Sequence, residues 1–240
     1  VDGYTEAEAD AEFVNDPNGA ITVDGDNVGI GISPTSRLHI GGTNPNLVFG
    51  SSGNELTYLQ RYNDDFYIFN KETSGDMLFG TANAERMRID TSGRVTMPYQ
   101  PAFLVTKSGD QTNLSLGYND ITWQNEVYDI GSNFASNTFT APVTGKYLLT
   151  ANISLKSQPK NAAWYILRIA TSNRNYMNSQ STGHWDTNAS DYLKTLASTV
   201  VVDMDANDTA SLMYYQYTGT AQADIAVDTI YTFFSGILLS

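Results

Sequence analysis

The feature that most constrains the fold is a two-residue alternation of side-chain character in the second half of the chain. From Tyr147 to Leu155 every second residue is apolar, and the positions between them hold Leu, Thr, Asn and Ser. Successive side chains of a strand point to opposite faces of a sheet, so this period indicates a strand with one buried face. We expect further strands at residues 102–105, 121–123, 127–129, 138–140, 164–169, 200–204, 210–217 and 230–239. Their number and spacing predict a β-sandwich.

Two of these segments are apolar on both faces. In the run 212–217, Leu212 and Tyr214 share one face, and the other face carries the Met and two Tyr residues that alternate with them. A two-layer antiparallel sandwich normally leaves one face of each sheet in water. An apolar second face therefore requires a cover, and we expect an identical subunit. The candidate residues for this interface are Tyr147, Trp164, Met213, Tyr215, Tyr217 and Phe233.

The composition agrees with an all-β chain and argues against several classes of function. Of the 240 residues, 16% are charged, against about 25% in an average soluble protein. Asn, Thr, Ser, Gly and Tyr, which favour strands and turns, take their place. The net charge of -13 opposes binding to nucleic acid or to an anionic membrane. No apolar run is long enough for membrane insertion, and the absence of cysteine excludes disulfides and thiolate chemistry.

Residues 1–18 form the one helical candidate. Thr5 and Glu8 fit a capping box, and positions 4, 7, 11 and 14 have the spacing of a coiled-coil seam. We expect either the short helical end of a trimeric stalk or a frayed terminus. Because the chain begins Val1-Asp2-Gly3 without a methionine, we also expect it to be the C-terminal part of a longer protein.

Residues 19–98 predict a repeated β-hairpin. The segments 21–30 and 87–97 share one order: a strand, an Asp, a Gly-containing turn and a second strand. Between them we expect short strands at residues 37–40, 47–49, 56–61, 66–69 and 76–79. Such strands are short and contain few core residues for a monomeric domain. We therefore expect this region to intertwine with sister chains.

Two segments of this region carry a resemblance to a known class of proteins. Asn27-Val-Gly-Ile-Gly31-Ile-Ser-Pro34-Thr-Ser-Arg37-Leu-His-Ile and Glu85-Arg-Met-Arg-Ile-Asp-Thr-Ser-Gly93 resemble repeated elements in tail fibres and spikes of bacterial viruses. The second unit departs from the first by lacking its later glycine, which fits a repeat that ends near residue 98. The resemblance implies a location on the virion surface, outside the host cell.

The remainder, residues 99–240, resembles the C1q-like globular domain. The resemblance rests on Phe139-Thr-Ala-Pro-Val-Thr-Gly145-Lys-Tyr147 and on the closing segment 233–240. It implies a ten-stranded jelly roll of the tumour-necrosis-factor type that assembles as a homotrimer. The sequence departs from the family at Leu149 and Ala151, where a second aromatic residue is usual. We therefore expect an all-β chain with a helical segment at 1–18, a repeat region at 19–98 and a jelly-roll head at 99–240.

Catalytic chemistry has weak support in the sequence. His184 and Asp186 lie near Ser181, but no nucleophile elbow accompanies them, so we expect no enzyme. A polysaccharide depolymerase remains an alternative, because close carboxylates occur and could serve a glycosidase. No cofactor is expected. A calcium ion is a weaker option because Asp-rich turns offer oxygen ligands; its candidate ligands are Asp203, Asp205 and Asp208.

Receptor contact should fall on loops rich in Tyr, Trp, Asn and Ser, which combine rigid aromatic area with adaptable hydrogen bonds. The candidate residues are Arg174, Tyr176, Asn178, His184, Trp185 and Asp186. The leading hypothesis is a non-enzymatic, homotrimeric viral fibre or spike protein whose head binds a host surface glycan or protein. The competing hypothesis gives the head only a trimerisation and capping role.

Overall fold

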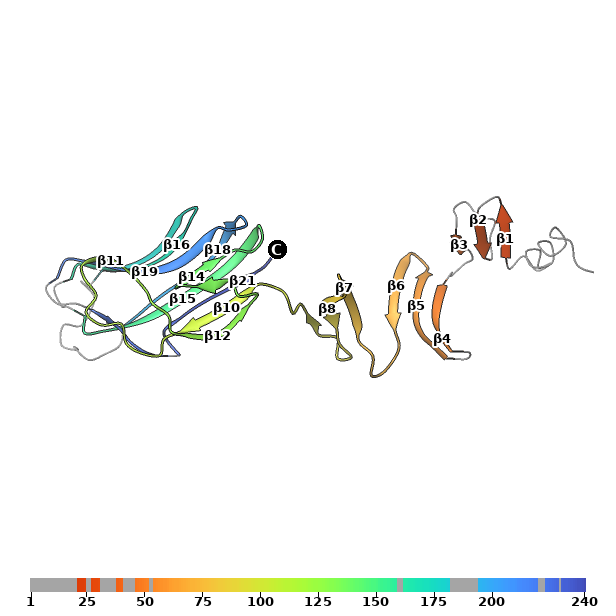
Figure 1. Ribbon diagram of the computed structural model, residues 1–240, viewed down its shortest axis with the longest axis horizontal. Helices are drawn as coiled ribbons and strands as arrows, with labels where there is room; N and C mark the ends of the chain where they lie inside the picture. The colour runs from red at the N-terminus through yellow and green to blue at the C-terminus, as the bar shows by residue number, and fades with distance from the viewer. Residues whose placement is uncertain are drawn as a thin grey trace, which may run out of the picture. The chain divides into compact units, whose positions relative to one another are not determined.

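The computed structural model describes residues 21–24, 27–30, 38–40, 46–51, 54–158, 162–181, 194–219, 223–228 and 230–240. The regular elements in these ranges are β-strands (Figure 1), and none of these residues belongs to a helix of the length and apolarity that a membrane span requires. The expected helix at 1–18 lies outside the described residues. The chain divides into two compact units, residues 1–97 and residues 98–240.

The first unit consists of small three-stranded sheets. Its strands are β1 (Ile21–Asp24), β2 (Asn27–Ile30), β3 (Leu38–Ile40), β4 (Asn46–Ser51), β5 (Asn54–Tyr62), β6 (Asp65–Asn70), β7 (Met77–Thr81), β8 (Ala84–Ile89) and β9 (Val95–Thr96). They form the sheets β1-β2-β3, β4-β5-β6 and β7-β8-β9. Neighbouring strands are antiparallel except β2 and β3, which are parallel.

The two predicted copies of the hairpin both form. Asp24 lies opposite Asn27 at the end of the β1–β2 pair, and Ile89 lies opposite Val95 in the β8–β9 pair. In the second copy, the Asp90 carboxylate accepts the backbone N–H of Ser92 at 2.9 Å and that of Arg94 at 3.0 Å. Gly93 adopts a φ of 79°, which favours glycine. The copies differ in their third strand, which is parallel in the first sheet and antiparallel in the last.

The first unit has no fully buried apolar core among its described residues. Among the described residues, every buried apolar side chain belongs to the second unit. In the first unit Phe66 is 68% exposed and Leu78 is 56% exposed. The short strands therefore place apolar area on the surface that a single chain does not cover.

The second unit, called the head below, is a two-sheet sandwich. Its first sheet contains β10 (Ala102–Thr106), β12 (Asn125–Ile130), β15 (Gly145–Lys156), β18 (Lys194–Met204), β20 (Asp224–Ile225) and β21 (Phe233–Leu238). Its second sheet contains β11 (Gly117–Asp120), β13 (Phe134–Ala135), β14 (Thr138–Thr140), β16 (Trp164–Thr171), β17 (Asn175–Ser181) and β19 (Thr209–Tyr217).

The order of these strands is that of a jelly roll. The first sheet runs β12-β10-β21-β15-β18 and the second runs β13-β14-β19-β16-β17, with β20 and β11 added beside β15 and β19. All of these pairs are antiparallel. The chain crosses repeatedly from one sheet to the other, and its last strand lies between β10 and β15 (Figure 1). The predicted jelly-roll sandwich is therefore confirmed by its connectivity: among the described residues, the two five-strand paths supply the ten predicted strands, and β11 and β20 are additional.

One predicted strand is wrong. Residues 121–123 are not in a strand, and the pairing instead involves β11, in which Tyr118 lies opposite Tyr215. Ile121 follows the strand and turns into the core, where it is 1% exposed. Its backbone N–H still bonds the carbonyl of Leu212 at 3.0 Å. Ile121 is therefore a core residue that follows a strand, and not a strand residue.

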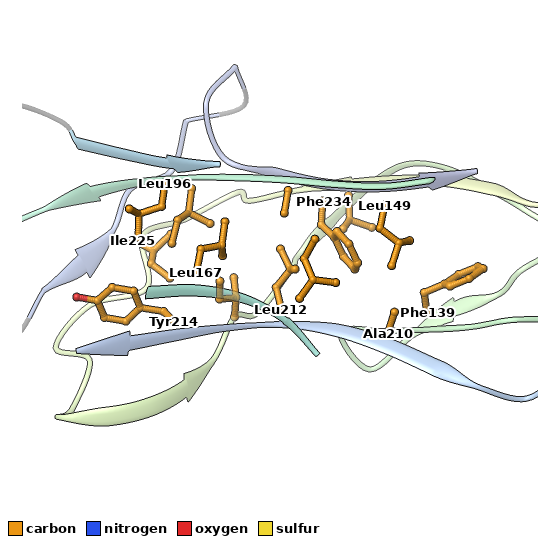
Figure 2. Packing of buried hydrophobic residues seen from close by; sticks show 14 of the residues in the cluster. Phe139, Leu149, Leu167, Leu196, Ala210, Leu212, Tyr214, Ile225 and Phe234 are labelled. Carbon is orange, nitrogen blue, oxygen red and sulfur yellow. The ribbon is translucent and has the colours of Figure 1, made fainter. Parts of the chain in front are cut away.

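The core of the head lies between the two sheets. Leu149 and Phe234 from the first sheet face Leu167 and Leu212 from the second (Figure 2). At one end the ring of Phe103 lies 4.8 Å from Phe139, measured between centroids. Further rings around Phe103 are those of Phe134 at 5.0 Å and Phe234 at 4.9 Å. Fully burying one such aromatic side chain stabilises the fold by about 1.5–3 kcal/mol.

A lysine is buried at the end of β10. Lys107 is fully buried, and its ammonium donates to the Thr122 carbonyl at 2.7 Å and to Gln111 Oε1 at 3.3 Å. Its Nζ also lies 5.9 Å from the centre of the Trp123 ring. Burial lowers the pKa of Lys107 to about 8, and the charge of Asp110 acts in the opposite direction. Charge at this position therefore costs the folded head free energy.

Candidate binding surfaces

The outer face of the first sheet is uncharged over a wide area, and one row across it is apolar. Strand pairing places side chains from five strands in three rows across this face. The first row is Ile130, Ala102, Ile237, Leu148 and Val201; the second is Tyr128, Leu104, Ser235, Thr150 and Thr199; the third is Thr106, Phe233, Asn152 and Ala197. No residue of these rows carries a charge. We call this surface the uncharged face.

Several side chains of the uncharged face project into solvent. Val201 is 51% exposed and Ile237 is 42% exposed. A sheet face that meets water normally carries charged and polar side chains on its outward positions. The first row across the uncharged face instead consists only of apolar residues. Ala102 in this row is buried, but Ile130, Ile237 and Val201 expose apolar area, and exposed apolar side chains gathered on one face mark an interaction site.

The outer face of the second sheet is aromatic. Tyr118, Tyr215 and Tyr217 form a ridge, with ring centroids 4.5 Å apart for the first pair and 6.5 Å apart for the second. The rings of Tyr215 and Tyr217 are nearly parallel, with 9° between their planes. Trp164 lies opposite Tyr217 in the strand register. Because β11, β16 and β19 are neighbours, these rings lie on one side of one sheet.

A single cation lies within this aromatic surface. Arg168 is opposite Met213 on β19 and Met177 on β17. Its guanidinium carbon lies 4.3 Å from the centre of the Tyr118 ring, and one of its N–H groups donates to Met213 Sδ at 2.9 Å. Tyr118 in turn donates its hydroxyl proton to Met177 Sδ at 3.9 Å. We call this surface the tyrosine face; its residues are Tyr118, Trp164, Arg168, Met177, Met213, Tyr215 and Tyr217.

The expected subunit-interface residues separate into three places. Trp164, Met213, Tyr215 and Tyr217 lie together on the tyrosine face, whereas Phe233 belongs to the uncharged face. Tyr147 is corrected to a core residue. Its ring is fully buried 5.5 Å from the Phe139 ring, and its hydroxyl donates to the Val143 carbonyl at 2.7 Å. It therefore has no surface to offer a partner.

The expected receptor-binding residues also separate. Arg174 is exposed in the turn between β16 and β17, where its backbone N–H donates to Thr171 Oγ1 at 3.0 Å. Tyr176 packs against the core, and Asn178 donates its amide N–H to the Ala197 carbonyl of the first sheet. Tyr176 and Asn178 thus contribute to packing within the head. His184, Trp185 and Asp186 lie outside the described residues.

The acidic turn expected to offer calcium ligands is closed by its own hydrogen bonds. Asp208 accepts the Ser172 hydroxyl at 2.7 Å, the Asn173 amide at 2.6 Å and the backbone N–H of Asp205 at 2.8 Å. The bond from Ser172 contributes most to lowering the pKa of Asp208. No group of three His, Cys, Asp or Glu side chains in the described part of the chain could hold a metal ion. Asp203, Asp205 and Asp208 therefore do not gather as a ligand set.

Three residues of the tyrosine face were absent from the sequence-based candidates. Met177 and Arg168 alternate with the core-facing residues of β17 and β16, so strand parity could have found them. Tyr118 belongs to a four-residue strand containing Gly and Asn, which are rare in strands. Nothing local predicts that this strand pairs with β19.

The chain has weak similarities to solved structures. No protein-family model matches it, and no curated protein matches it in sequence. It is similar to murine APRIL, with a TM-score of 0.42 and 13% identity over 58% of this chain and 99% of that one. It is likewise similar to the globular domain of zebrafish complement 1qA protein, with a TM-score of 0.42 and 19% identity over 59% and 98%. The jelly-roll assignment rests on the strand order and not on these similarities.

Proposed function

We propose that this chain is the distal part of a homotrimeric viral fibre or spike and attaches the virion to the host cell surface through its head, without enzymatic activity. The placement on a virus is supported by the two tail-fibre-like segments, at residues 27–40 and 85–93, each of which overlaps one of the repeated hairpins. The first unit exposes apolar side chains, which intertwining with sister chains would cover. Such a region suits a shaft that carries a compact head.

The uncharged face is the observation that carries the proposal of self-association. A second copy of the chain can cover it without burying a charge, which is the costly step in forming an interface. The apolar first row would occupy the centre of the contact, as in subunit interfaces that resemble a protein core. The tyrosine face suits this role less well, because closing it would bury Arg168.

Assembly can be tested with charge substitutions on the two outer faces. Light scattering of the purified chain should give the mass of a trimer. Leu148→Glu or Ile237→Glu places a carboxylate in the first row of the uncharged face, so either variant should dissociate the trimer. Met177→Glu, which adds the same charge to the tyrosine face, should leave the trimer intact. A monomeric wild-type chain refutes self-association. If only the Met177 substitution dissociates the trimer, the subunit interface lies on the second sheet.

Attachment through the head requires a separate test on whole cells. We assign the contact to the exposed residue Arg174 and to His184, Trp185 and Asp186, which the sequence makes candidates and which lie outside the described residues. The double substitution Arg174→Ala and Trp185→Ala should weaken binding of labelled trimer to host cells without changing its mass. Unchanged adsorption would favour the head as a trimerisation and capping module. Release of sugar from host polysaccharide by the wild-type chain would instead support a depolymerase.

A further inference from the structure

We propose that the tyrosine face binds an acidic saccharide, in which a sugar ring stacks on the exposed tyrosines and its carboxylate pairs with Arg168. The inference rests on the proposed role in host attachment and adds to it a second contact surface and the class of ligand that this surface binds. This surface is separate from the loop that contains Arg174.

The ridge of rings is accessible over most of its length. Tyr217 is 51% exposed, Tyr118 is 45% exposed and Trp164 is 44% exposed. They project from three neighbouring strands of a packed sandwich, so their positions are held by the sheet. Rigid rings offer contact area at a small cost in conformational entropy. The apolar face of a sugar ring can lie on such a platform, while the hydroxyl groups at the ring edge stay in contact with water.

Arg168 supplies the charge that selects an acid. In the described part of the chain it makes no ion pair; Asp120, which lies opposite Met213 on β11, does not pair with it. Its Nε is buried without a hydrogen-bond partner, and the contact with Met213 sulfur occupies one of its other donors. A guanidinium fork fits a carboxylate with two parallel hydrogen bonds. The buried Nε is out of a ligand's reach, but no hydrogen bond from Nη1 is made in the described part of the chain, so a ligand carboxylate would bind the terminal nitrogens of the guanidinium.

The positions of the rings and the cation match one kind of molecule. The Arg168 guanidinium lies against the Tyr118 ring, at the edge of the ridge formed by Tyr118, Tyr215 and Tyr217. A hexuronic acid carries its carboxylate at the edge of the sugar ring, so one residue can stack and form an ion pair at the same time. The chain has a net charge of -13, but at physiological salt the repulsion from distant carboxylates is screened over about 8 Å. Asp120, which shares this side of the sheet with Tyr118, is the nearby carboxylate that opposes an acidic ligand. The contacts at the face then decide the affinity.

A second copy of the chain is a poorer occupant of this face. Covering the rings with an apolar surface would also cover Arg168, and an unpaired buried guanidinium is strongly unfavourable. The uncharged face offers a second copy a contact without this cost. The two outer faces therefore differ in the chemistry of the partner they suit.

The test is titration of the trimeric chain with defined oligosaccharides. The probes are a hyaluronan hexasaccharide, a galacturonic acid hexasaccharide, and the same two compounds with their carboxylates reduced to alcohols. At least one acidic probe should bind at millimolar concentrations or below, and its reduced form should bind at least tenfold more weakly. Arg168→Gln and Tyr118→Ala should each weaken binding by about tenfold, as expected for loss of an ion pair or an exposed ring contact of about 1.4 kcal/mol. Arg61→Gln removes an exposed arginine from the first unit and should leave the affinity unchanged.

Each outcome has a defined meaning. Arg168→Lys keeps the positive charge but loses the guanidinium fork, so the variant should retain part of the affinity. Partial retention distinguishes the loss of the ion pair with the ligand from a folding defect. Failure of both acidic probes to bind, equal binding of the reduced forms, or equal loss with Arg61→Gln overturns the inference. If the acidic probes fail while labelled trimer still adsorbs to host cells, the inference falls and the attachment function stands. If the Arg168 substitution changes the mass of the assembly, a second copy is the occupant and the inference is wrong.

Discussion

The buried ammonium of Lys107 should make the head more stable as the pH rises from neutral to moderately basic. Burial lowers the pKa of the Lys107 amine in the folded head to about 8, whereas an unburied lysine has a pKa of 10.5. Between these values the unfolded chain binds a proton that the folded head does not. The free energy of unfolding therefore increases with pH in this window. This direction is opposite to that of a lysine stabilised by an ion pair.

The size of the effect follows from the two pKa values. The full difference corresponds to about 3 kcal/mol, since one pKa unit is about 1.4 kcal/mol. Between about pH 7 and about pH 9.5 the linkage relation gives an increase of about 2 kcal/mol in the free energy of unfolding. The range should stop below about pH 10, because burial raises the pKa values of Tyr147, Tyr165 and Tyr214. The unfolded chain ionises these tyrosines first, which lowers stability at higher pH.

The assay is urea unfolding at equal protein concentration, followed by tryptophan fluorescence, for the wild type and for Lys107→Met. Methionine has a similar length and no charge, so the variant should lose the increase that this amine causes. Other groups that titrate in the range are common to both proteins and cancel in the comparison. A wild-type free energy that stays flat or falls up to about pH 9.5, or an equal rise in the variant, would refute the reasoning.

Further substitutions test the packing of the head and its acidic turn. A Cβ on Gly236 would lie 2.4 Å from Phe103 Cε1 and 2.8 Å from Leu149 Cδ2, so Gly236→Ala should cost about 1–3 kcal/mol in urea unfolding; a cost near zero would contradict this packing. Phe103→Ala leaves a cavity among three phenylalanine rings and should lower the free energy of unfolding by about 3–5 kcal/mol. A decrease smaller than that caused by Gly236→Ala would argue against this packing. Asp208→Ala should speed hydrogen exchange at the amide of Asp205, which donates to that carboxylate. Hydrogen bonds lower the pKa of Asp208 in the folded head. The difference in free energy of unfolding between wild type and variant should therefore shrink as the pH falls through that lowered pKa. A difference that stays constant with pH would contradict the assignment.

Much of the fold could be predicted because strands leave a local signal. The alternation from Tyr147 to Leu155 corresponds to β15, and the turn residues around Asp90 predicted the β8–β9 hairpin. Both depend on interactions within a few residues, namely side-chain parity and hydrogen bonds to a nearby carboxylate. The strand at 117–120 was missed because its pairing with β19 joins segments about a hundred residues apart.

The candidate surfaces were predicted less well, and the reason is geometric. Parity states which residues share a face, but it does not state which face turns towards the core. Tyr176 was therefore placed on a receptor surface although it packs inward. For Tyr147 the alternation up to Leu155 already indicates the buried face of β15, so its prediction as an interface residue is wrong on the local pattern itself. For β19, both faces are apolar, so the local pattern is the same for either orientation.

From the order of its amino acids alone, the chain reveals an all-β architecture, a repeated hairpin before residue 98 and a jelly-roll head after it. The strands and the hairpin follow from the period of strands and the chemistry of turns, which act over short distances, whereas the jelly-roll connectivity was implied only by the resemblance to the C1q-like domain. The tertiary structure was needed to place Ile130, Ala102, Ile237, Leu148 and Val201 in one uncharged row, and to place Arg168 against Tyr118. Residues of a row come from distant parts of the chain and become neighbours only through strand pairing, whose register is set by the packing of the whole sandwich.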